Sequence, residues 1–109
     1  MKRGELWTMA GGSGYASKPR PVVIVQDDAF AARDSIVVCL ITTDTTDLPV
    51  FRVWVEPTAE NGLKATSRLM VDKVTIVSRN RLGQKIGRLN DDDVIRLNRS
   101  LLVFLGLAR

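Results

Sequence analysis

Two short, uninterrupted runs of apolar residues constrain this fold more than any other feature of the sequence. Residues 22–25 read VVIV and residues 36–41 read IVVCLI, and β-branched side chains dominate both runs. β-branched residues favour strands, and a run without polar alternation is expected where both faces of a strand are covered. A chain of 109 residues is long enough to bury such strands in one core, so we expect a single domain over residues 1–109.

Further strands are predicted around these two runs. Partial or clean alternation, or β-branched clustering, marks residues 5–9, 50–55, 67–71, 74–77 and 84–89. Pro57 ends the strand expected at residues 50–55, and Asn61-Gly62 is a turn signal. Between the two apolar runs we expect a turn or one helical turn, capped by Asp27 or Asp28.

The last element has the pattern of a helix. Asn90 can cap it, and three aspartates follow at the positive end of the helix dipole. The apolar residues then recur at helical spacing and form one stripe: Val94, Leu97, Leu101, Leu102 and Leu105. Strands first and a helix last predict a mainly β fold, a small and strongly bent sheet or barrel closed by the C-terminal helix.

The residue types that are missing exclude several kinds of catalyst. The chain has no histidine and one cysteine, so Ser-His-Asp and Cys-His nucleophilic systems and thiolate or imidazole zinc sites are excluded. Cys39 lies inside an apolar run and is interpreted as a core residue. The aspartate clusters suit turns and a helix start, and the glycine-rich loop before Pro19 lacks the Lys-Ser/Thr ending of a phosphate-binding loop. We therefore predict no metal and no cofactor.

The beginning of the chain and its hydropathy bear on location. Met1 leads into mixed sequence without the pattern of a signal peptide, and no apolar run approaches the roughly 18 residues of a membrane span. A single cysteine allows no disulfide within the chain. We expect a reducing, cytoplasmic setting.

Positive charge is concentrated in one region. The net charge is +4, and residues 64–88 hold seven basic side chains against the single acid Asp72. Such an excess fits a phosphate-binding face, and it fits a solvated surface of strands and turns equally well. The basic residues are Lys64, Arg68, Lys73, Arg79, Arg81, Lys85 and Arg88.

Arg20 stands between two prolines, directly before a buried strand. Pro19 and Pro21 hold the backbone on either side of it extended, which limits where its guanidinium can point. The next long strand ends in hydroxyl groups at Thr42 and Thr43. Taken alone, Arg20 would be interpreted as one partner of a surface ion pair, and the threonines as part of an ordinary turn. Together, at neighbouring strand ends, they indicate an oxyanion site.

Four segments of the chain form a combination that is typical of one protein family. They are Lys2-Arg3-Gly4-Glu5-Leu6-Trp7, KPRPVVIVQDD from residue 18, Ile41-Thr42-Thr43, and the stretch from Asn61-Gly62-Leu63 to Met70-Val71-Asp72-Lys73. With these segments the chain resembles the MazF/PemK toxin endoribonucleases, from residue 2 to about residue 105.

The resemblance implies a fold and an activity. The fold is the small SH3-like β-barrel of the MazF and CcdB toxins with a C-terminal helix. The implied reaction is metal-independent, sequence-specific cleavage of single-stranded RNA by attack of a ribose 2′-hydroxyl, which leaves a 2′,3′-cyclic phosphate and a 5′-hydroxyl. Arg20 matches the family's catalytic arginine and Thr42 its catalytic threonine, with Thr43 as the alternative one position further on.

The resemblance also implies substrate contacts, and the sequence departs from the family at one place among them. The expected RNA-binding residues are Ser13, Gly14, Tyr15, Lys18, Thr43 and Lys73. Many members carry Gly-Ser-Glu-Gln in the first loop, whereas this chain has Gly-Ser-Gly-Tyr, so no loop carboxylate is present there. Because an arginine stays protonated at neutral pH and cannot accept the proton of the 2′-hydroxyl, no general base is assigned.

The resemblance also implies partners, and two alternative functions stand beside it. The expected partners are an antitoxin with an extended acidic segment and a second copy of the chain. A CcdB-like inhibitor of DNA gyrase without catalysis is the first alternative, although this chain ends GLAR and not in an aromatic-Gly-Ile tail. A non-catalytic SH3-like binding module is the second alternative, but aromatic residues make up only 6%, and no peptide groove is evident.

Overall fold

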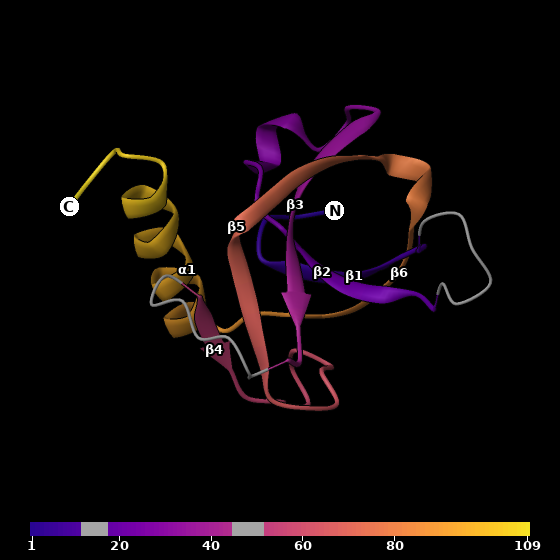
Figure 1. The fold of residues 1–109 in the computed structure, drawn as a ribbon. Coiled ribbons are helices and arrows are strands. Elements are labelled where there is room, and N and C mark those ends of the chain that lie inside the picture. Colours follow the sequence, from indigo (N-terminus) through magenta and orange to yellow (C-terminus); the bar gives the residue numbers. More distant parts are fainter. Residues whose placement is uncertain (12–17, 45–51) are drawn as a thin grey trace.

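Six strands form one antiparallel sheet that curls around a buried core, and one helix packs against its edge (Figure 1). The computed structural model describes residues 1–11, 18–44 and 52–109. The strand order is β4-β5-β3-β2-β1-β6. The strands are β1 (Glu5–Met9), β2 (Arg20–Ile24), β3 (Ser35–Thr42), β4 (Val53–Val55), β5 (Ser67–Ser78) and β6 (Leu82–Arg88), and the helix is α1 (Asp91–Phe104).

Most predicted elements are confirmed, and one pair of strands is corrected. Asp27 caps a short 3-10 helix, Asp28–Phe30, by accepting a hydrogen bond from the Ala29 N–H at 2.8 Å.

The strands expected at 67–71 and 74–77 are one continuous strand, β5. Its register against β3 shifts between Cys39, which pairs with Val74, and Leu40, which pairs with Met70. The polar residues that seemed to end a strand instead lie in a bulge, where the strand bends.

The fold is mainly β and its sheet is barrel-like, as predicted, but hydrogen bonds between strands do not close the sheet. Among the described residues β4 and β6 are the edge strands and do not pair with each other. A turn before β5 reaches β6 instead, where the Arg88 N–H donates to the Glu60 carbonyl at 3.0 Å. A Cβ on Gly62 would lie 2.1 Å from the Ile86 carbonyl oxygen, so only glycine permits this approach.

Asn61 holds that turn together from inside. It is almost fully buried, its Oδ1 accepts from the N–H groups of Thr58 and Leu63, and its Nδ2 donates to the Glu56 carbonyl. A buried amide is stable only when its polar atoms are satisfied, and here they are. The Asn61-Gly62 signal therefore marks the turn that bridges the open edge of the sheet.

The two faces of the sheet carry separate apolar clusters. One cluster contains Leu6, Val23, Cys39 and Leu69 and is completed by Leu97 of α1. The other cluster is built around Val22, Ile24, Ile36 and Val38. Cys39 is 0% exposed, as expected for a core residue, and burial raises the pKa of its thiol to about 12.

Helix α1 begins as predicted and is covered over only part of its length. The Asn90 side chain accepts from the Asp93 N–H at 2.8 Å. Of the apolar stripe, Leu97 is fully buried, whereas Leu102 and Leu105 are exposed. No helix of the described residues has the length and apolar character needed to cross a membrane.

Glu5 fastens the start of β1. Its Oε1 accepts from the Lys2 N–H at 2.9 Å and from the Trp7 indole at 3.0 Å, and its Oε2 lies 3.1 Å from the Lys85 ammonium. Burial alone would raise the pKa of Glu5, but the hydrogen bonds from Lys2 and Trp7 and the contact with Lys85 lower it from 4.5 to about 2.

This carboxylate makes the free energy of unfolding depend on pH in the acidic range. Because the folded pKa is depressed, its stabilisation is complete above about pH 4.5 and is lost as the pH falls towards 2, amounting to about 3 kcal/mol. We expect Glu5→Gln to lower the free energy of unfolding at pH 7 by about 1–3 kcal/mol and to flatten its pH dependence below pH 5. Urea unfolding from pH 7 to pH 3 measures both, with the exposed Glu60→Gln as control. An unchanged slope in Glu5→Gln would contradict this assignment.

Candidate active site

Arg20 opens β2 at the edge of a small hollow. It is exposed, and among the described residues its side chain makes no hydrogen bond or ion pair. Pro21 follows it within the strand, so the backbone that carries the arginine is extended and its φ is fixed. A guanidinium on a rigid strand end that has no partner of its own is available to an anion.

Thr42 ends β3 and presents its hydroxyl in a defined way. The side chain is half-buried, and its Oγ1 accepts a hydrogen bond from the Asp44 N–H at 3.0 Å. A threonine hydroxyl has one proton to donate and lone pairs to accept with. Since the Asp44 amide occupies an acceptor position, the proton remains available to a phosphoryl oxygen.

The register of the sheet brings these two residues together. Val22 pairs with Leu40, and continuing that antiparallel register by two residues places Arg20 opposite Thr42. Both side chains line one hollow of about 170 Å³, whose apolar walls come from Met9, Leu40 and Met70 and from neighbouring residues of β2 and β3. An arginine and a hydroxyl donor thus converge where two strand ends meet.

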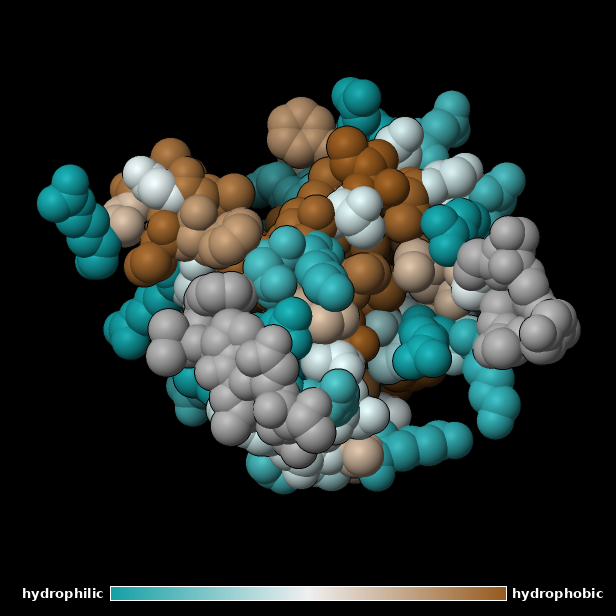
Figure 2. All heavy atoms as spheres, in the orientation of Figure 1, coloured by the Kyte–Doolittle hydropathy of each residue, from teal (hydrophilic) through white to brown (hydrophobic). Residues whose placement is uncertain are grey.

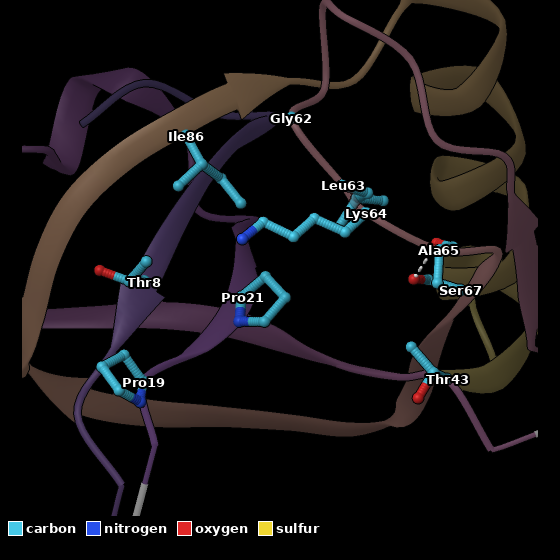
Figure 3. Close-up of a pocket in the computed structure, with 10 residues that line it drawn as sticks. All are labelled: Thr8, Pro19, Pro21, Thr43, Gly62, Leu63, Lys64, Ala65, Ser67 and Ile86. Atoms are coloured by element: carbon cyan, nitrogen blue, oxygen red, sulfur yellow. Dashed lines mark hydrogen bonds between the residues drawn. The ribbon is translucent and has the colours of Figure 1, made fainter.

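A second hollow, of about 340 Å³, adjoins the first at Pro21 (Figure 3). Leu63 and Ile86 give it apolar walls, and the Lys64 side chain extends across it. Hydroxyl groups stand around it at Thr8, Thr43 and Ser67. A flat, partly apolar ligand with an anionic neighbour matches this combination of groups.

The other candidate residues fall into three groups. Thr43 lines the second hollow, beside Thr42, and Lys18 is exposed two residues before Arg20. Lys73 is exposed in the bulged part of β5, and it lines neither hollow. Ser13, Gly14 and Tyr15 lie outside the described residues.

The basic residues of segment 64–88 do not form one face. Lys85 pairs with Glu5, Arg88 lies between Glu60 and Asp91, and Arg68 is buried. Arg79 and Arg81 donate to backbone carbonyls of Arg33 and Ala10. Only Lys64 of this group lines a hollow at the site, so most of the excess is spread over the surface.

Sequence reasoning did not single out Lys64, Thr8 or Ser67 as site residues. Lys64 and Ser67 lie in the loop and strand start that follow the Asn61-Gly62 turn, and the turn carries them to the hollow. Thr8 faces it from β1, where its Oγ1 also accepts from the Gln84 N–H at 2.9 Å. Only the pairing of distant strands reveals their position, although the Asn-Gly signal marked the turn.

A family model decides the family. The model of PemK-like, MazF-like toxins of type II toxin–antitoxin systems matches residues 2–105, almost the whole chain. The chain belongs to this family. The PemK/MazF assignment made on the four sequence segments is thereby confirmed, and the CcdB-like alternative is not favoured.

Relatives of this MazF-family toxin agree in sequence and in fold. It is 49% identical over 108 residues to the probable endoribonuclease MazF of Mycolicibacterium smegmatis, with 99% of each chain covered. A solved endoribonuclease in complex with its cognate antitoxin, from a mycobacterial species, has a TM-score of 0.82 at 23% identity and covers 100% of this chain and 98% of its own. A chain of the MazE–MazF structure from Deinococcus radiodurans has a TM-score of 0.78 at 17% sequence identity. The match covers 97% of this chain and 96% of that chain. Both structures share the fold of the sheet and helix.

Proposed function

We propose that this MazF-family toxin is an endoribonuclease that cuts single-stranded RNA, without a metal, at the hollow shared by Arg20 and Thr42. The observation that carries the proposal is the convergence of Arg20 and Thr42 at two neighbouring strand ends. The arginine is held on a rigid backbone and is unpaired within the described residues, and the hydroxyl of the threonine is oriented by a hydrogen bond. The relative in Mycolicibacterium smegmatis, 49% identical, bears the name of a probable endoribonuclease.

The reaction is a transfer within the RNA strand. The ribose 2′-oxygen forms a bond to the adjacent phosphorus, and the bond from phosphorus to the 5′-oxygen of the next nucleotide breaks. The 2′-hydroxyl loses its proton and the leaving 5′-oxygen gains one, so the products are a 2′,3′-cyclic phosphate and a 5′-hydroxyl. Charge accumulates on the phosphoryl oxygens as the pentavalent species forms. Arg20 neutralises that charge and Thr42 donates a hydrogen bond to it.

The second hollow suits a nucleotide next to the cleaved phosphate. Its apolar walls can contact a base or ribose, while the Lys64 ammonium attracts the adjoining phosphate. Lys18 and Thr43 add a cation and a hydroxyl at the same strand ends. Ser13, Gly14 and Tyr15, which lie outside the described residues, are part of the proposal as RNA contacts because their loop resembles that of the family. Lys73 is kept as a more distant contact, because it lies outside both hollows.

The antitoxin of such a toxin would compete for the same cations. A solved relative is a complex of an endoribonuclease with its cognate antitoxin. An extended acidic segment matches a groove with Lys18, Arg20 and Lys64 on its walls and rim, because carboxylates occupy the positions that phosphates take in RNA. Toxin and antitoxin would meet in the cytoplasm, where the RNA is.

A homodimer accounts for the uncovered apolar side chains of α1. Figure 2 shows apolar residues at the end of this helix, where Leu105 is 61% and Leu107 is 73% exposed. A hollow of about 620 Å³ lies between them and Val25, which follows β2, and Val37 of β3. Contiguous exposed apolar surface of this kind marks a protein interface, and a second copy of the chain is the occupant we propose.

Cleavage of RNA in the presence of EDTA tests the proposed function. The purified protein is expected to cut a long single-stranded RNA into fragments whose 5′ ends accept phosphate from a polynucleotide kinase without prior dephosphorylation. The same RNA annealed to its complement is the control and should stay intact. Intact single-stranded RNA, together with inhibited supercoiling by gyrase, would replace the proposal with the CcdB-like alternative.

A further inference from the structure

Arg68 is a buried arginine beside the site. It is the second residue of β5 and is 1% exposed. In the register of the sheet it pairs with Thr42 on one side and with Trp54 of β4 on the other. Paired residues of antiparallel strands point to the same face, so Arg20, Thr42 and Arg68 stand in one row across three neighbouring strands.

The guanidinium of Arg68 is only partly satisfied. Its Nη2 donates to the Asp44 carbonyl, and its carbon lies 5.3 Å from the centroid of the Trp54 ring. Among the described residues its buried Nε and Nη1 have no hydrogen-bond partner, and no acidic side chain forms an ion pair with it. A buried charge without a counter-ion destabilises a fold, so this arginine is not explained by stability.

A chain of hydrogen bonds connects Arg68 to the Thr42 hydroxyl. Arg68 holds the carbonyl of Asp44, and the N–H of the same residue donates to the Thr42 Oγ1 at 3.0 Å. Residue 44 lies two positions beyond the end of β3, and the described part of the chain resumes at residue 52. Through these two hydrogen bonds the backbone of residue 44 joins the buried guanidinium to the Thr42 hydroxyl.

We propose that Arg68 is a positioning residue, which orients the Thr42 hydroxyl towards the phosphate through the backbone of Asp44. The inference rests on the proposed endoribonuclease activity and adds a residue to it. The buried arginine fixes the turn at residues 42–44, and the turn fixes which lone pair of the hydroxyl is occupied. The proton of Thr42 then points to where charge develops in the transition state.

Arg68→Met separates this role from a purely structural one. Methionine fills a similar apolar volume without a charge, so the melting temperature is expected to stay the same or rise. At the same time kcat for RNA cleavage is expected to fall by about ten- to hundredfold with KM within about threefold, because the orientation of a catalytic group is lost and binding is not.

Arg96→Met is the matched control. Arg96 also donates to a backbone carbonyl of β4, that of Trp54, at 2.5 Å, and it contacts Asp93 at 2.5 Å, but neither contact involves Thr42. We expect this variant to lower the melting temperature and to leave kcat of the folded protein unchanged. A fall of both melting temperature and kcat in Arg68→Met would show a structural residue and overturn the inference.

A double-mutant cycle with Thr42→Val tests the route. If Arg68 acts through the hydroxyl, Arg68→Met lowers kcat by less than about threefold when that hydroxyl is absent. Equal losses in both backgrounds would disprove positioning through Thr42. Wild-type protein that leaves RNA intact would instead refute the proposed function itself, which keeps the two failures distinct.

Discussion

Arg20→Ala is expected to abolish nearly all RNA cleavage while leaving the fold intact. The residue is exposed, and none of its side-chain atoms is bonded to another described residue, so its loss removes no contact from the folded protein. Of the residues that the structure describes, it is also the only one that brings a guanidinium to the hollow at the end of β3. Removing a charge aimed at the transition state typically costs about a thousandfold in rate or more.

The comparison with Arg20→Lys and Arg99→Ala sharpens this result. Lysine keeps the charge but not the planar pair of donors, so it should restore only part of the activity. Arg99 is exposed on α1, outside both hollows, and Arg99→Ala should cleave like the wild type. Single-turnover rates on one RNA, with melting curves for each variant, make the measurement. Cleavage by Arg20→Ala within tenfold of the wild type would remove Arg20 from the mechanism.

Gly62→Ala should destabilise the fold more than any other alanine substitution proposed above. Gly62 has a φ of +72°, and a Cβ there would lie 2.1 Å from the carbonyl oxygen of Ile86 and 2.9 Å from its carbonyl carbon. Both neighbours are backbone atoms of β6 and cannot rotate away. Either the turn or the edge of the sheet must shift, and we expect a loss of about 3–5 kcal/mol in the free energy of unfolding.

Gly106→Ala isolates the close approach from the backbone strain. Gly106 has a similar φ of +78°, but nothing lies within 4 Å of the position of its Cβ. Its loss should be about 1 kcal/mol, the strain of a left-handed residue alone. Urea unfolding of both variants measures the difference. Equal losses would mean that the turn does not bridge the open edge of the sheet.

The residues of the site were predictable where local sequence specifies them. Prolines on both sides of Arg20 and hydroxyls at the end of an apolar run are visible in the chain, and the register of β2 and β3 is consistent with their meeting. For Arg68 the sequence predicted only that it belongs to the basic segment 64–88. Its role depends on pairing with Thr42 and on burial, and neither has a local signal in the sequence.

The nature and order of the elements follow from local features of the chain. Side-chain branching, alternation and capping residues act within a few positions, so the strands, the capped helix and the buried Cys39 could be predicted from them, as could the toxin family. The folded structure was needed to show which strands are neighbours, how Gly62 and Asn61 bridge the open edge, and why residues 67–78 form one bent strand and not two. Pairing and burial join residues far apart in the chain, and their free energies depend on the whole packed sheet.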